Sequence, residues 1–189
     1  MRVISGTARG TRLVSLGSAE IRPTLDRVKE SFFNQVGPGL EGVAFLDLFA
    51  GSGSMGIEAL SRGAENVVFV DPSPKAQRII MQNLEKCKMT DDPSRWVLLK
   101  STALAGLKKL QQQGLGFDLI YIDPPFADGL YEPTLLELSP SDILHSDAVV
   151  VVEHFHKTAL QENYDKLKFY KDRRLGDSCL SFFRYEGSL

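Results

Sequence analysis

The stretch Asp47-Leu-Phe-Ala-Gly51-Ser-Gly53-Ser-Met-Gly56 follows an apolar run and precedes a segment with helical periodicity. Its glycines match the spacing GxGxxG, which permits a sharp turn from strand to helix and a close approach of a ligand to the backbone. We expect Gly56 to be required for tight packing of the helix on the strand. Asp71 ends the next apolar run, 20 residues after Gly51. An acid at that position would hold the hydroxyl groups of a ribose.

Strand-like and helix-like segments alternate through most of the chain. The apolar runs are continuous, as is typical of parallel strands covered by helices on both faces. The expected strands are 43–48, 67–71, 96–99, 117–123 and 148–153, and the expected helices are 26–36, 54–62, 74–88, 102–113 and 131–138. Two further strands, 167–170 and 179–185, predict a C-terminal hairpin. The pattern indicates an α/β, Rossmann-like fold with a mostly parallel, seven-stranded sheet.

The first 22 residues differ from this alternation and predict a small β element. Val3-Ile4 would pair with 13–16 around a turn between Gly6 and Gly10. Thr24 is expected to cap the helix that follows. We expect one domain over 1–189, in which 1–22 face the substrate and 23–189 form the catalytic core.

Composition narrows the class of protein. The chain has 189 residues, of which 43% are hydrophobic and 24% charged, as in ordinary globular domains. Cys87 and Cys179 match no zinc or CxxC spacing and predict thiols in a reducing cytoplasm. No apolar stretch suits a signal peptide or a membrane span. We expect a cytoplasmic monomer without a metal.

The net charge of −2 does not favour general nucleic-acid binding, yet the cations are clustered. Such clusters either anchor phosphates or form ordinary solvated faces. The N-terminal cluster comprises Arg2, Arg9, Arg12, Arg22, Arg27 and Lys29, and the C-terminal one comprises Lys166, Lys168, Lys171, Arg173 and Arg174.

Asp123-Pro-Pro-Phe126 closes the apolar run that begins at Phe117. The prolines stiffen the peptide and remove two backbone donors, so its carbonyls stay available as acceptors. An amino group would fit between the Asp123 carboxylate and the Pro124 carbonyl, with the Phe126 ring against the base. Asp123, Pro124, Pro125 and Phe126 are therefore the candidate catalytic residues of an enzyme that modifies an amino group on a nucleobase.

Asp47 separates two classes of cofactor. A carboxylate just before the glycine loop would repel a pyrophosphate, whereas it would favour the sulfonium and ammonium groups of S-adenosylmethionine. A nicotinamide-dependent oxidoreductase has no evident use for Asp123-Pro-Pro-Phe126. It remains a distant alternative, as does a catalytically silent RNA-binding module.

Asp47 to Gly53 resembles the first motif of class I S-adenosylmethionine-dependent methyltransferases, and Asp123 to Phe126 resembles their amine-methylating motif. The segments Arg2-Val-Ile-Ser-Gly, Arg9-Gly-Thr-Arg-Leu and 22–34 resemble the RsmD family, which methylates guanine N2 in 16S ribosomal RNA. The resemblance covers nearly the whole chain. It implies 16S ribosomal RNA or the small ribosomal subunit as the partner.

The resemblance also assigns site residues. Those expected to bind the cofactor are Arg22, Thr24, Asp47, Phe49, Gly51, Ser52, Gly53, Asp71, Pro72 and Thr102. Those expected to bind RNA are Arg2, Arg9, Arg12 and Arg27. Family members often carry Asp-Ala where this chain has Thr102-Ala103, so the contact to adenine falls to Thr102 or to a backbone amide. Adenine N6 offers the same two hydrogens as guanine N2, so a DNA or other RNA amino-methyltransferase remains the main alternative.

Overall fold

The computed structural model describes residues 1–17, 24–125 and 129–187, with the side chains of Thr24 and Leu25 left aside. Its strands are β1 (Ala44–Leu48), β2 (Asn66–Val70), β3 (Trp96–Leu99), β4 (Phe117–Ile122), β5 (Leu144–Phe155), β6 (Asn163–Tyr164), β7 (Leu167–Leu175) and β8 (Ser178–Tyr185). Its helices are α1 (Thr24–Val36), α2 (Ser54–Ser61), α3 (Pro74–Lys86), the short 3-10 helix η1 (Pro93–Arg95), α4 (Ala103–Gln112) and α5 (Tyr131–Leu138).

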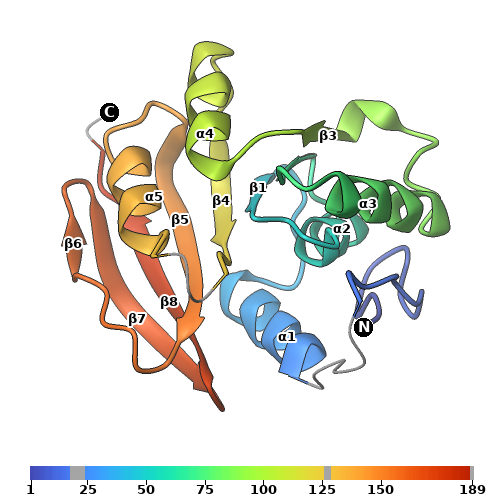
Figure 1. The fold of residues 1–189 in the computed structure, drawn as a ribbon, viewed down its shortest axis with the longest axis horizontal. Helices are drawn as coiled ribbons and strands as arrows, with labels where there is room; N and C mark the ends of the chain where they lie inside the picture. Colours follow the sequence, from blue (N-terminus) through green and yellow to red (C-terminus); the bar gives the residue numbers. More distant parts are fainter. Residues whose placement is uncertain (18–23, 126–128, 188–189) are drawn as a thin grey trace.

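The sheet has the strand order β3-β2-β1-β4-β5-β8-β7-β6 and forms the middle of three layers (Figure 1). The first five strands in this order are parallel, and β8 runs antiparallel to β5. This confirms the predicted Rossmann-like fold and its C-terminal hairpin. The expected count of seven strands was wrong for the described residues, because the two-residue strand β6 is too short to leave a pattern.

Two hydrophobic cores lie on opposite faces of the sheet. One contains side chains of α1, α2, α3 and the N-terminal segment, and the other contains side chains of α4 and α5. Both faces are therefore covered, which explains why the central strands are continuous apolar runs. In β2, for example, Val67 and Phe69 belong to the first core, whereas Val68 and Val70 belong to the second.

The N-terminal β element is smaller than predicted. The only antiparallel pair found in the described part of this segment is an isolated bridge between Arg2 and Arg12. The register also differs, because Val3 donates to Thr11 O at 2.9 Å and not to 13–16. Val14 instead bonds Asn83 of α3, with its N–H at 2.7 Å from Oδ1. Tertiary contacts with α3 thus replace the second half of the expected hairpin.

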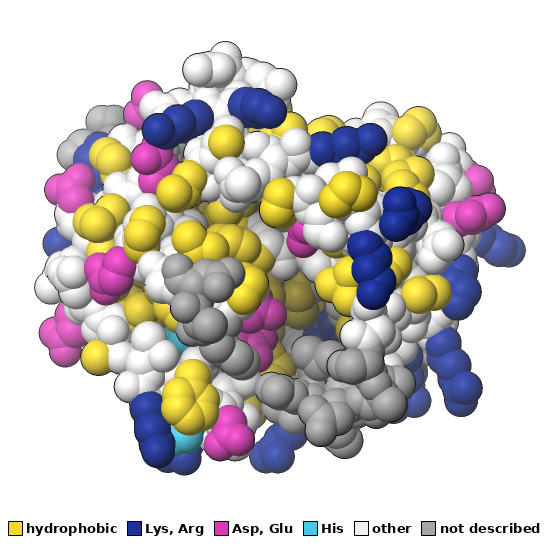
Figure 2. All heavy atoms as spheres, in the orientation of Figure 1, with side chains coloured by type: hydrophobic (Ala, Val, Ile, Leu, Met, Phe, Trp, Pro, Cys, Tyr) yellow, Lys and Arg dark blue, Asp and Glu magenta, His cyan; other side chains and the backbone are white. Residues whose placement is uncertain are grey.

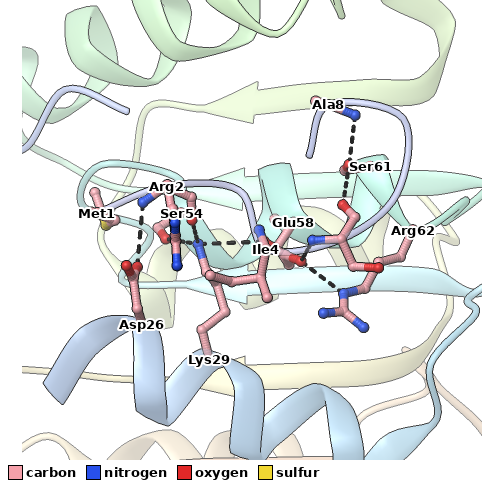
Figure 3. Close-up of polar contacts among 12 residues, drawn as sticks. Met1, Arg2, Ile4, Ala8, Asp26, Lys29, Ser54, Glu58, Ser61 and Arg62 are labelled. Carbon is pink, nitrogen blue, oxygen red and sulfur yellow. Dashed lines mark hydrogen bonds and ion pairs between the residues drawn. The ribbon is translucent and has the colours of Figure 1, made fainter. Parts of the chain in front are cut away.

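A buried ionic network joins this segment to α1 and α2 (Figure 3). Glu58 of α2 is fully buried, and its carboxylate accepts from Ile4 N at 2.8 Å and Ser5 N at 2.9 Å. Arg62 Nε lies 2.8 Å and Lys29 Nζ 3.4 Å from the same carboxylate. The network fixes the N-terminal segment against the core. Lys29, predicted from sequence as part of an exposed basic cluster, is therefore internal and has a structural role.

Candidate active site

Four acidic side chains meet where parallel strands end. Asp47 lies in β1, Asp71 follows β2, Asp123 follows β4, and Glu153 lies near the end of β5. Because β1 is flanked by β2 and β4, the carboxyl ends of these strands form one edge, where open α/β sheets bind ligands. A cavity of about 790 Å³ opens there and is bounded by Asp71, Asp123 and Glu153 among others. Figure 2 shows a hollow near the centre of the molecule in which acidic side chains lie among hydrophobic ones.

The glycine loop turns as its sequence predicts. Gly51 and Gly53 have φ of 55° and 75°, in the left-handed region that favours glycine, and Phe49 shares it with φ 64°. Because Phe49 carries a side chain, its backbone is strained in this conformation, and such strain is common at ligand sites. A Cβ at Gly56 would lie 2.3 Å from the Phe69 ring, which confirms that this glycine allows α2 to pack on β2.

Asp71 organises the loop as well as facing the cavity. Its Oδ2 accepts from Gly51 N at 2.8 Å, and its Oδ1 accepts from Ser73 N at 2.8 Å. Each carboxylate oxygen retains a further lone pair, so both can still accept from hydroxyl groups of a ligand. The predicted ribose contact is compatible with this geometry.

Asp47 is 2% exposed, and its Oδ2 accepts from Gly56 N, in the first turn of α2, at 2.9 Å. Burial raises the pKa of Asp47 to about 8, and the bond from Gly56 only partly opposes that effect. Asp47 also lines a second cavity of about 240 Å³, which shares Phe49, Gly51 and Glu153 with the larger one. The sequence predicted Asp47 as a cofactor contact, and the structure adds its role in holding α2.

Asp123 faces both cavities beside Glu153. Burial raises the pKa of Asp123 well above its ordinary value, and the carboxylates of Glu153 and Asp47 raise it further. No ion pair joins Asp123 or Glu153 to a cation among the described residues. Tyr121 donates its hydroxyl to Glu153 Oε2 and so fixes that carboxylate. The centre is rich in acidic groups, and a cationic ligand would stabilise their ionised forms.

Glu153 is an acidic site residue that sequence reasoning missed. It is 6% exposed and borders both cavities. The signal was present, because Glu153 is the single acid after the apolar run that starts at Ala148. The same pattern, one acid at the end of a buried strand, identified Asp71 and Asp123.

The remaining predicted cofactor and catalytic residues divide into two groups. Phe49, Pro72, Thr102, Pro124 and Pro125 line the larger cavity, and Ser52 lines the smaller one. Thr102 precedes α4 without a capping bond from its side chain, which leaves its exposed hydroxyl for other partners. Arg22, Phe126 and the side chain of Thr24 lie outside the described residues.

The α5 helix contributes two polar groups that the sequence did not single out. The hydroxyls of Tyr131 and Thr134 are buried and have no hydrogen-bond partner among the described residues. Thr134 borders the larger cavity. Burial raises the pKa of Tyr131 to about 12, and Asp123 and Glu153 add to the effect. This wall of the cavity is therefore not wholly apolar.

The four arginines predicted to bind RNA, namely Arg2, Arg9, Arg12 and Arg27, are exposed. Three of them belong to the N-terminal segment that the buried network holds in place. Figure 2 shows Lys and Arg side chains gathered on the side of the molecule over α3 and this segment. Among the helices of the described residues, none is both long and apolar enough to cross a membrane.

A model of the family described as "Conserved hypothetical protein 95" matches residues 1–184. The chain belongs to this family. It is 35% identical to the Bacillus subtilis protein named "Putative rRNA methyltransferase YlbH", over 99% of this chain and 100% of that one. It is 37% identical to "Ribosomal RNA small subunit methyltransferase D" of Haemophilus influenzae, over 81% of this chain and 78% of the relative.

A solved structure supports the same assignment. It is named "Putative methyltransferase yhhF from Escherichia coli" and superposes with a TM-score of 0.82 at 29% identity, covering 100% of this chain and 99% of that one. The family resemblance inferred from the motifs is confirmed. The protein is a methyltransferase of the class I fold, whose cofactor is S-adenosylmethionine.

Proposed function

We propose that this protein transfers the methyl group of S-adenosylmethionine to the N2 amine of a guanine in small-subunit ribosomal RNA. The observation that carries the proposal is the meeting of the glycine loop, Asp71 and Asp123-Pro124 around one cavity. The names of the Haemophilus and Bacillus relatives supply the class of substrate.

The cavity suits this cofactor in size and charge. A volume of about 790 Å³ lies within the usual range for small-molecule sites, roughly 300–1,000 Å³. The cofactor supplies a methyl group made electrophilic by a sulfonium, and it carries an ammonium. Asp47 and Glu153 would face these cations, Asp71 the ribose, and Thr102 the adenine. Phe49, Ser52 and Pro72 would complete the walls, with Arg22 and Thr24 at the methionine end.

Asp123 and Pro124 would hold the target amine. The lone pair of guanine N2 is delocalised into the ring, so the nitrogen becomes acidic only as the new bond to carbon forms. The Asp123 carboxylate would accept one N–H of the amine, and the Pro124 carbonyl would accept the other. These two hydrogen bonds would orient the lone pair toward the methyl group. Asp123 would then take the proton that the nitrogen loses. Pro125 stiffens this turn, and Phe126 would stack on the base.

RNA would be held by the exposed arginines of the N-terminal region. Arg2, Arg9 and Arg12 project from a segment anchored through Glu58, so they form a fixed surface for phosphates. Arg27 adds a cation from α1. In this proposal 1–22 serve substrate binding and 23–189 serve catalysis.

The proposal is tested with small ribosomal subunits from cells that lack this protein. Labelled methyl groups are transferred to these subunits, and the nucleosides of the RNA are then analysed. The expected product is N2-methylguanosine. Label in N6-methyladenosine would replace the guanine assignment with adenine. Absence of label in subunits and in naked RNA, from protein that binds S-adenosylmethionine, would overturn the ribosomal substrate.

A further inference from the structure

The β7–β8 hairpin carries a concentration of positive charge that the proposed function leaves unexplained. Residues 163–185 contain six cations, namely Lys166, Lys168, Lys171, Arg173, Arg174 and Arg184. The same segment has only three acids, namely Asp165, Asp172 and Asp177. The whole chain has a net charge of −2, so this segment is opposite in sign to the rest.

Strand register places four of these cations on one face. Along β8, Leu180 and Phe182 point into the core beneath α1, and Arg184 continues the same alternation. Their partners on β7 are Arg173, Lys171 and Lys168, respectively. Residues directly opposite each other in an antiparallel pair share a face. Lys168, Lys171, Arg173 and Arg184 therefore lie on the α1 side of the hairpin.

An aromatic ring stands among these cations. Tyr170 occupies the irregularity in β7 between Phe169 and Lys171 and is 40% exposed. Lys171 Nζ lies 5.4 Å and Arg184 Cζ 5.2 Å from the centre of its ring. An exposed ring beside two cations can stack on a base while the cations contact phosphates.

This face leads toward the candidate active site. Arg173 pairs with Leu180, and Leu180 pairs with Glu153 on its other side. Two strand spacings therefore separate the backbones of Arg173 and Glu153, about 10 Å. Glu153 and Leu180 share the α1 face, so the cations and the acidic centre lie on the same side of the sheet.

We propose that the hairpin face, defined as Lys168, Tyr170, Lys171, Arg173 and Arg184, is a second RNA-binding surface that holds the strand flanking the target nucleotide. The cations contact phosphates, and Tyr170 stacks on an unpaired base. This inference rests on the proposed RNA substrate and adds a contact surface separate from the N-terminal arginines.

Charge on this hairpin has an alternative explanation in edge protection. Strands near a sheet edge often carry lysines that prevent pairing with another chain. Edge protection does not account for Tyr170 and Phe169, because exposed aromatic rings make a sheet edge more prone to associate with another chain. Edge protection would also work with charge of either sign, whereas a phosphate site works only with positive charge. Charge reversal therefore separates the two explanations.

The test is the double variant Arg173→Glu/Arg184→Glu, compared with Lys108→Glu/Lys109→Glu. The control changes the net charge equally but lies on α4, across the sheet. RNA affinity would be measured with small ribosomal subunits, together with the KM for subunits and the affinity for S-adenosylmethionine. The hairpin variant should bind subunits about 10- to 100-fold more weakly at 0.1 M salt, with a salt dependence shallower by about 1.5 in log–log slope. Its cofactor affinity and solubility should match those of the control.

Tyr170→Ala and Tyr170→Phe test the stacking contact without changing charge. The alanine variant should lose about fivefold or more in RNA affinity, whereas phenylalanine should retain it. If the charge-reversed hairpin binds subunits as tightly as the α4 control while the wild type methylates them, the hairpin face is wrong and the proposed function stands. If the wild type binds S-adenosylmethionine but neither binds nor methylates ribosomal RNA, both the hairpin face and the proposed function are wrong.

Discussion

The buried Glu58 and the pair formed by the half-buried Asp123 and the buried Glu153 are both acidic centres, but their surroundings are opposite. Glu58 is surrounded by two backbone amides, Lys29 and Arg62, and its charge is neutralised inside the protein. Asp123 and Glu153 border cavities and have no cationic partner among the described residues. A buried charge is costly unless it is paired. The first centre is therefore complete in itself, whereas the second is suited to a cation from outside.

The largest effect should come from Asp123→Asn. The asparagine side chain has one acceptor oxygen, and in place of the second it has an N–H₂ donor. It is also not a base, so it cannot take the proton that the target amine loses. Methyl transfer should fall about a thousandfold, measured by single-turnover transfer to small subunits, while S-adenosylmethionine still binds. Asp118→Asn is the control, because Asp118 lies within β4, the strand that Asp123 follows, and its carboxylate bonds Ala44 N and His145. Loss of cofactor binding in Asp123→Asn would move Asp123 out of the catalytic role.

Glu58→Gln should lower the free energy of unfolding by about 3–5 kcal/mol, because it leaves Lys29 buried without its charge partner. Burial already lowers the pKa of Lys29, which the carboxylate of Glu58 opposes. Urea unfolding would measure the loss, with Glu85→Gln on the exposed side of α3 as the control. Equal stability of the two variants would show that the network is not needed for folding.

Glu153→Gln should weaken S-adenosylmethionine binding by about tenfold, equivalent to roughly 1.4 kcal/mol, through loss of a charge facing the cation. The Glu153 carboxylate also helps to raise the pKa of Asp123. Its removal should lower that pKa, so the acid limb of the profile of kcat/KM against pH should move to lower pH. An unmoved limb would mean that Asp123 and Glu153 are not coupled.

The smallest effect concerns pH and the charge of the cofactor. The pKa of Asp47 is about 8 and that of Asp123 is raised, so both carboxyls favour the neutral form in the free protein. Unfolded aspartates ionise near pH 4, so these groups make the free protein less stable as pH rises from about 4 to 8. A cation favours their ionised forms, so S-adenosylmethionine should bind several-fold more tightly at pH 8 than at pH 6. S-adenosylhomocysteine, which lacks the sulfonium charge, should show a weaker trend by calorimetry.

Much of the fold was predictable because its signals are local. Continuous apolar runs identified the five parallel strands, and Gly51 and Gly53 identified the turn that opens the cavity. The pairing of 3–4 with 13–16 was wrong, because Val14 bonds Asn83, 69 residues away in the chain. Contacts over such a separation leave no periodic pattern. The strand β6 escaped notice because two residues carry no periodicity.

The sequence alone determined that acids would gather at one edge of the sheet, because the ends of adjacent parallel strands must lie together. The tertiary structure decided which buried acids are neutralised. Glu58 is compensated by Ile4 and Ser5 from a distant segment, whereas Glu153 is held by Tyr121 and faces a cavity. The charge state and role of a buried carboxyl depend on burial and on neighbours within a few ångströms, and only the folded chain sets both.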